Sequence, residues 1–128
     1  MSVSVTSQTS PYVDKLIVDT QSNVTSEAAV FTGASANVYI VDIDNTNNAN
    51  TIHYVKLFNA NVSGDIGGSN APTEPDVILL VPAGKRQAVT VQDGVLFGSD
   101  FSFACVTLSA TAGNTSPVNN VTVRIMAE

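Results

Sequence analysis

Apolar residues in this chain recur with a period of two rather than 3.6, and this spacing limits the fold more than any other feature of the sequence. Near the C-terminus, Val121, Val123 and Ile125 alternate with Thr122 and Arg124. Successive side chains of a β-strand point to opposite faces of a sheet, so the alternation predicts strands with one buried face. No segment has the spacing of an amphipathic helix. We therefore expect an all-β protein.

Turn residues divide the chain into eight expected strands. Eight strands fit a two-sheet antiparallel β-sandwich of either jelly-roll or immunoglobulin-like topology. The longest loop is expected at 62–75, and Asp93 with Gly94 predicts a hairpin or a bulge. We expect an extended N-terminal arm at 1–12 and one sandwich domain at 13–128. The expected strands are 13–20, 24–31, 36–44, 51–60, 76–81, 86–92, 100–109 and 119–126.

The expected strands at 36–44, 51–60 and 76–81 are apolar on both faces. A strand of a simple sandwich is apolar on one face only. The second face must be covered by a loop, by the N-terminal arm or by another subunit. We expect another subunit, and therefore a homo-oligomer. The clearest case is the strand at 76–81, whose opposed apolar faces consist of Ile78 and Leu80, and of Val77, Leu79 and Val81.

Composition narrows the classes of partner. The 128 residues are 44% hydrophobic and 12% charged, with a formal net charge of −6. The only adjacent basic residues are Lys85 and Arg86, whereas binding to nucleic acid or anionic lipid needs clustered cations. The N-terminus does not resemble a signal peptide, and the apolar run at 77–81 is too short to span a membrane. We expect synthesis in a host cytoplasm, without nucleic-acid or membrane partners.

The residues that most often carry chemistry are scarce. Cys105 is the sole cysteine and lies in an apolar run, without the cationic neighbour that a reactive thiolate needs. His53 is the sole histidine and lies in an expected strand beside Val55 and Leu57. Structural zinc needs about four His or Cys ligands. We expect both residues in the core or an interface, and we expect no enzymatic activity, no cofactor and no metal.

The sequence offers two alternative binding sites, one for calcium and one for sugars. The segment 42–47 resembles the start of a calcium loop through Asp42 and Asp44, but it lacks the glycine and the closing glutamate of such a loop. β-Sandwiches also bind sugars on aromatic side chains. Tryptophan is absent, and Tyr12 is the tyrosine that we expect to be exposed.

Three stretches resemble small structural proteins of tailed bacteriophages, especially those that infect cyanobacteria. These are 38–58 (VYIVDIDNTNNANTIHYVKLF), 75–84 (PDVILLVPAG) and 104–117 (ACVTLSATAGNTSP). The resemblance implies a virion component: a head decoration (cement) protein, a head-fibre base, or a tail or spike domain. Decoration proteins of this kind are often trimers of jelly-roll or immunoglobulin-like domains, placed where major capsid protein subunits meet. No catalytic residues follow from the resemblance.

The resulting interpretation is a capsid decoration protein on the virion surface, which binds the major capsid protein and stabilises the head. We expect a homo-oligomer, and the resemblance implies a trimer. The alternative is a tail or fibre domain that binds a host surface glycan. We expect the contacts in the arm and in the long loop. The expected partner-binding residues are Ser2, Val3, Ser4, Val5, Thr6 and Tyr12 in the arm, and Ile66, Pro72 and Pro75 in the loop.

Overall fold

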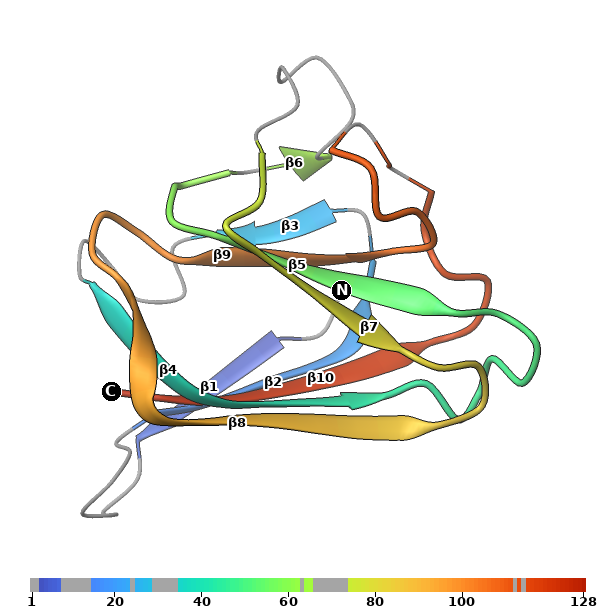
Figure 1. Cartoon of the computed structure of the whole chain (residues 1–128), viewed down its shortest axis with the longest axis horizontal. Coiled ribbons are helices and arrows are strands. Elements are labelled where there is room, and N and C mark those ends of the chain that lie inside the picture. Colours follow the sequence, from blue (N-terminus) through green and yellow to red (C-terminus); the bar gives the residue numbers. More distant parts are fainter. Residues whose placement is uncertain are drawn as a thin grey trace.

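The computed structural model describes residues 3–7, 15–23, 25–28, 35–62, 64–65, 74–111, 113 and 115–128. These residues form ten β-strands and no helix. The strands make two five-stranded antiparallel sheets that pack face to face (Figure 1). The predicted all-β sandwich is confirmed.

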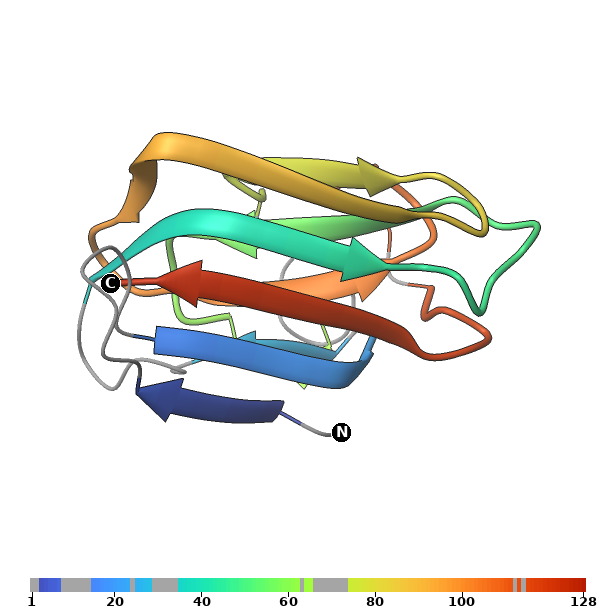
Figure 2. The ribbon, with the colours of Figure 1, turned by 90° about the horizontal axis from the view of Figure 1, so that it is seen from below.

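Each sheet combines segments that are distant in the sequence. Eight of the strands correspond to predicted ones, and β1 and β6 are additional. The first sheet (Figure 2) consists, in spatial order, of β1 (Val3–Ser7), β2 (Lys15–Ser22), β10 (Val121–Ala127), β4 (Ala36–Asp44) and β8 (Arg86–Phe97). The second sheet consists of β6 (Gly64–Asp65), β3 (Thr25–Ala28), β9 (Ser102–Val106), β5 (His53–Phe58) and β7 (Val77–Val81).

The order of connections decides the topology that the sequence left open. From β2 to β5 the chain changes sheet at every step, and it does so again from β7 to β10. Between these runs, β5 and β7 pair as neighbours in the second sheet. An immunoglobulin-like sandwich instead keeps consecutive strands such as A and B in one sheet. The described strands therefore have jelly-roll topology.

The core lies between the sheets and consists of their inward-facing side chains. In β10, Val121, Val123 and Ile125 are fully buried, while Thr122 and Arg124 are half-buried on the outer face. The predicted alternation of this strand is confirmed. Each such aliphatic side chain contributes about 1.5–3 kcal/mol through burial.

Strand β4 departs from the predicted alternation because its pairing with β10 is bulged. Ile40 and Val38 lie opposite the consecutive residues Met126 and Ala127, which leaves Tyr39 as the extra residue, and Val38 and Val41 both face the core. Regular alternation would place Tyr39 on the same face as Val41. Instead Tyr39 is half-buried, and its hydroxyl donates a hydrogen bond to the carboxylate of Glu128 at 3.1 Å. A bulge places two successive residues where regular pairing allows one, which removes Tyr39 from the inward row.

Strand β8 continues beyond its predicted end at residue 92, and its pairing with β4 has a second irregularity, with the extra residues in β8. Asp93 and Gly94 lie inside β8, so of the two predicted alternatives the bulge is confirmed. Gly94 has a φ of 78°, and a Cβ atom there would overlap the side chain of Asn37. Glycine is required at this point because it tolerates positive φ and close approach.

Side-chain amides hold the polar turn between β4 and β5. Asn48 and Asn119 exchange two hydrogen bonds between side chain and backbone, each 3.1 Å long. Asn45 donates to the carbonyl of Pro82 at 3.1 Å, and the N–H of Gly84 donates to the carbonyl of Asn48 at 2.9 Å. Three loops are thereby joined at one end of the sandwich, and buried backbone groups receive partners.

The outer face of β5 and β9 is covered by the segment that follows β9. Lys56 is fully buried, and its Nζ donates hydrogen bonds to the carbonyls of Ala110 and Gly113 at 2.5 and 3.0 Å. We expected another subunit to cover the second apolar face of this strand, and for β5 that expectation is wrong, because its own chain covers it. The outer side of this sheet also has a buried apolar cluster, which consists of Phe58, Val62, Ala104 and Val106.

The described part of the N-terminal arm expected at 1–12 is the strand β1. This strand pairs antiparallel with β2 along its whole length, beginning with Val3 opposite Asp19. Val3 packs against the core. The alternation of valine with serine and threonine that suggested an extended arm allows this segment to complete a sheet of its own domain.

Replacing Lys56 by alanine should destabilise the domain. The change removes a buried aliphatic stem and leaves the carbonyls of Ala110 and Gly113 without their donor. We expect the free energy of unfolding, measured by urea denaturation, to fall by about 2–4 kcal/mol. The control Lys85→Ala, at an exposed position, should change it by less than about 0.5 kcal/mol. Equal stabilities of the two variants would contradict an anchoring role for Lys56.

Candidate interface at the sheet edges

Two open sheets have four edge strands, and these differ in how well they are protected against pairing with another chain. Strand β6 has two residues, which is too short to serve as a template. Strand β8 is bulged and carries Arg86, Gln92 and Asp93. Strands β1 and β7 have five residues each and no charged residue. They lie on opposite sides of the sandwich, β1 beside β2 and β7 on the side of β8 (Figure 2).

Strand β7 is apolar on both faces. Val81 is fully buried, and Val77 and Leu79 pack against the core. On the outer face Ile78 and Leu80 are 43% and 48% exposed. The described residues thus leave uncovered the second apolar face that the sequence predicted for this strand.

Two neighbours enlarge the exposed apolar surface on the outer side of β7. Tyr54 of β5 lies directly opposite Leu80 in the register. Ile52, which precedes β5, is 45% exposed. We call the surface formed by Ile52, Tyr54, Ile78 and Leu80, together with the unpaired side of β7, the β7 edge. Exposed apolar surface of this kind is typical of sites that contact other proteins.

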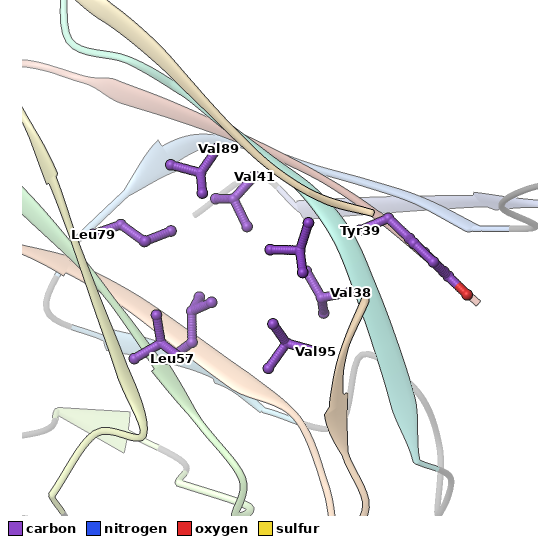
Figure 3. Close-up of a pocket in the computed structure, with 9 residues that line it drawn as sticks. Val38, Tyr39, Val41, Leu57, Leu79, Val89 and Val95 are labelled. Carbon is purple, nitrogen blue, oxygen red and sulfur yellow. The ribbon is translucent and has the colours of Figure 1, made fainter. Parts of the chain in front are cut away.

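A narrow apolar slot lies behind the β7 edge, between the two sheets. Its volume is about 70 Å³. Leu57 and Leu79 line it from the second sheet, and Val38, Val41, Val89 and Val95 line it from the first, whereas the Tyr39 ring points away (Figure 3). The slot is comparable in size to a few methyl groups. It therefore marks where the core is incompletely closed between β7 and β8.

Opposite charges flank β7. Glu74 and Asp76 precede the strand and are exposed, and Lys85 follows it after the turn and is also exposed. Arg86 is already engaged, because its Nε donates to both carboxylate oxygens of Asp42 at 3.0 and 3.1 Å. The β7 edge thus has an acidic end, an uncharged centre and a basic end.

The predicted partner-binding residues are dispersed. Pro75 is half-buried just before β7, on the side of the sandwich opposite β1, so the structure does not bring the described arm and loop residues together. On β1, Val5 is 44% exposed and Ser4 and Thr6 are also exposed. Ser2, Tyr12, Ile66 and Pro72 lie outside the described residues.

The sequence prediction placed Ile78 and Leu80 on an apolar face to be covered by another subunit, but it did not name them, or the exposed Ile52, among the partner-binding residues. A signal was present in the uncharged run 77–81, which has two apolar faces. The contacts were instead expected in the arm and the loop, since a strand with two apolar faces is as easily a central strand as an edge strand. Only the sheet order places β7 at an edge.

Burial shifts the pKa of several side chains in the described part of the chain, among them Cys105, Asp19 and His53. Burial raises the pKa of the Cys105 thiol to about 12, so it stays protonated at neutral pH, as expected of a core cysteine. Burial also raises the pKa of Asp19, opposed by a hydrogen bond from the N–H of Gln21. Burial lowers the pKa of His53, opposed only in part by the Thr51 backbone.

The acidic pair that resembled a calcium loop has other partners. Asp42 binds the guanidinium of Arg86. Asp44 accepts hydrogen bonds from the backbone and hydroxyl of Thr46 at 3.0 and 2.6 Å, and these lower its pKa. Among the described residues, no three His, Cys, Asp or Glu side chains are grouped as metal ligands. The same residues contain no helix long and apolar enough to cross a membrane.

Comparison of the chain with protein-family models, with curated proteins and with solved structures finds no match.

Burial of His53 predicts a loss of stability at mildly acidic pH. Its pKa in the folded protein lies below the ordinary 6.5, so the unfolded chain binds the proton more readily. The free energy of unfolding should therefore be highest above about pH 6.5 and fall as the pH drops below that value. In His53→Leu this dependence should largely disappear. Urea titrations between about pH 8 and 5.5 test this, and parallel pH profiles for the two proteins would contradict it.

Proposed function

We propose that this chain is a non-enzymatic structural protein of a virus particle, and specifically a capsid decoration protein that binds the major capsid protein and stabilises the head. The observation that carries the proposal is the resemblance of the stretches 38–58, 75–84 and 104–117 to structural proteins of tailed bacteriophages. In the fold these stretches supply β4, β5, β7 and the segment over Lys56. The resemblance therefore covers elements that define the sandwich.

The fold is compatible with a capsid decoration protein, but it does not by itself identify one. Jelly rolls occur in viral capsid proteins, and also in lectins and cupins. Because one fold hosts many functions, the topology supports a virion role only together with the sequence resemblance. A sandwich with uncharged sheet edges is suited to a protein that works among neighbours.

A decoration protein stabilises a shell by contacting several capsid subunits at once. Multivalent attachment allows each contact to be weak while the whole remains tight. The free edge of β1 suits such a contact, since an edge strand can add a strand of a neighbouring protein to its sheet. Val5 contributes exposed apolar surface there, and Ser4 and Thr6 contribute hydroxyl groups. We propose β1 as a contact with the major capsid protein.

The second candidate function is a tail or fibre domain that binds a host glycan. A shallow depression of about 380 Å³ favours it, because Asn47, Asn119 and Asn120 line it together with Val118. Amide side chains bind sugar hydroxyls in many proteins. However, the amides of Asn47 and Asn119 already donate to backbone carbonyls, and the lining has no aromatic ring on which a sugar could stack.

Antibody labelling of intact particles that carry this chain distinguishes the two functions. Regular labelling over the head supports a decoration protein, and labelling confined to the tail tip supports the glycan-binding alternative. Particles without any label would overturn both.

Substitution of Val5 should weaken attachment to heads. Val5→Lys places a charge on the free edge of β1, and we expect roughly 5- to 30-fold weaker binding to purified heads that lack the protein, measured by co-sedimentation. The control is Leu96→Lys, at a position that is 66% exposed in β8, at the opposite edge of the same sheet. Circular dichroism checks that both variants fold. Equal binding of both would exclude β1 as the capsid contact.

A further inference from the structure

We propose that the β7 edge is a site of self-association, where β7 of a second copy of this chain pairs antiparallel with β7 about a two-fold axis at Leu79. The second sheets of the two copies would then form one continuous sheet. This inference does not depend on the virion role, because it follows from the geometry and the sequence of a single edge strand.

The first argument is the unpaired backbone of β7. In an antiparallel sheet, alternate residues of an edge strand point their N–H and C=O groups away from the neighbouring strand. Strand β7 pairs with β5 on one side, and no described residue pairs with its other side. It has no lysine, proline or bulge of the kind that blocks pairing at other edges.

The second argument is that the β7 sequence is self-complementary. With the axis at Leu79, Val77 of one copy lies opposite Val81 of the other, and Ile78 lies opposite Leu80. Ile78 and Leu80 both face outward and are about half exposed, so each would gain an apolar neighbour directly across the strand pair. Every cross-strand pair in this register is apolar.

The third argument selects a second copy of this chain over an unrelated partner. Antiparallel pairing about Leu79 brings the acidic end of one β7 edge against the basic end of the other. Glu74 of each copy comes opposite the turn that carries Lys85 of the other copy. Both side chains are exposed. The same arrangement occurs twice in the pair, so attraction at both ends offsets part of the repulsion between two chains of net charge −6.

The size of the contact predicts a weak pair. Five residues of strand with a few apolar neighbours cover less than the roughly 1,200 Å² of a standard interface. We expect a dissociation constant on the order of 10 to 100 µM for the free protein. An isologous contact closes at two copies, so the trimer implied by the resemblance would need a different surface.

Disulfide trapping tests the pairing and its register. Ile78→Cys and Leu80→Cys are made as separate proteins, and the native Cys105 is buried and does not compete. Under mild oxidation, a mixture of the two should form cross-linked dimers roughly tenfold faster than either protein alone, since residue 78 faces residue 80 of the second copy. Equal rates in all three samples would overturn the proposal.

Charge exchange tests the orientation independently. Glu74→Lys and Lys85→Glu each create two repulsive ends in a homodimer, and each should pair roughly 3- to 10-fold more weakly than the wild type in sedimentation equilibrium. Mixing the two variants restores opposite charges at both ends, so the mixed pair should return to wild-type affinity. A mixture as weak as its components would contradict antiparallel pairing.

A charged substitution tests whether dimers form through the β7 edge or through other exposed apolar surface. Leu80→Lys should abolish dimer formation in sedimentation equilibrium, and Leu96→Lys, on the other sheet and 66% exposed, should leave it unchanged. Dimers of Leu80→Lys with wild-type affinity would overturn the proposal. If Leu80→Lys binds phage heads normally but remains a monomer, self-association and the virion role are separate properties.

Discussion

Burial of the inner faces of two sheets against each other is the interaction on which the rest of the structure depends. Residues such as Ile17, Val55, Val123 and Ile125 are fully buried between the layers. They come from strands that are distant in sequence, because the chain changes sheet at almost every step of the jelly roll. The two layers therefore fold together or not at all. Their stacking also leaves four sheet edges, which this small domain must cover or use.

Lys56 and His53 are buried polar groups that lie among apolar side chains. Lys56 lies on the outer face of the second sheet, and two carbonyls of the segment after β9 hold its ammonium group. A buried charge needs such partners, so the lysine fixes the position of this segment. His53 lies inside without comparable support, and burial lowers its pKa, so protonation of His53 should destabilise the fold.

The two uncharged edge strands, β1 and β7, are proposed to bind different partners. Strand β1 has one exposed valine among small hydroxyl residues, which suits contact with a capsid subunit. Strand β7 is apolar on both faces and flanked by opposite charges, which suits pairing with itself. A protein that joins neighbours through one edge and its own copies through the other would extend a network across a shell. Each contact could remain weak, because attachment at several points multiplies the affinity.

The sequence by itself determined the all-β class, eight of the strands, the inward row of β10 and the core position of Cys105. These depend on alternation and on turn residues, which are local properties of the chain. Tertiary structure alone decided that residues 3–7 join their own sheet, that a bulge turns Tyr39 out of the inward row, and that β7 lies at an edge while β5 is covered. Whether a doubly apolar strand is central or exposed depends on which strands pair beside it, and pairing between distant segments leaves no mark in the local pattern of residues.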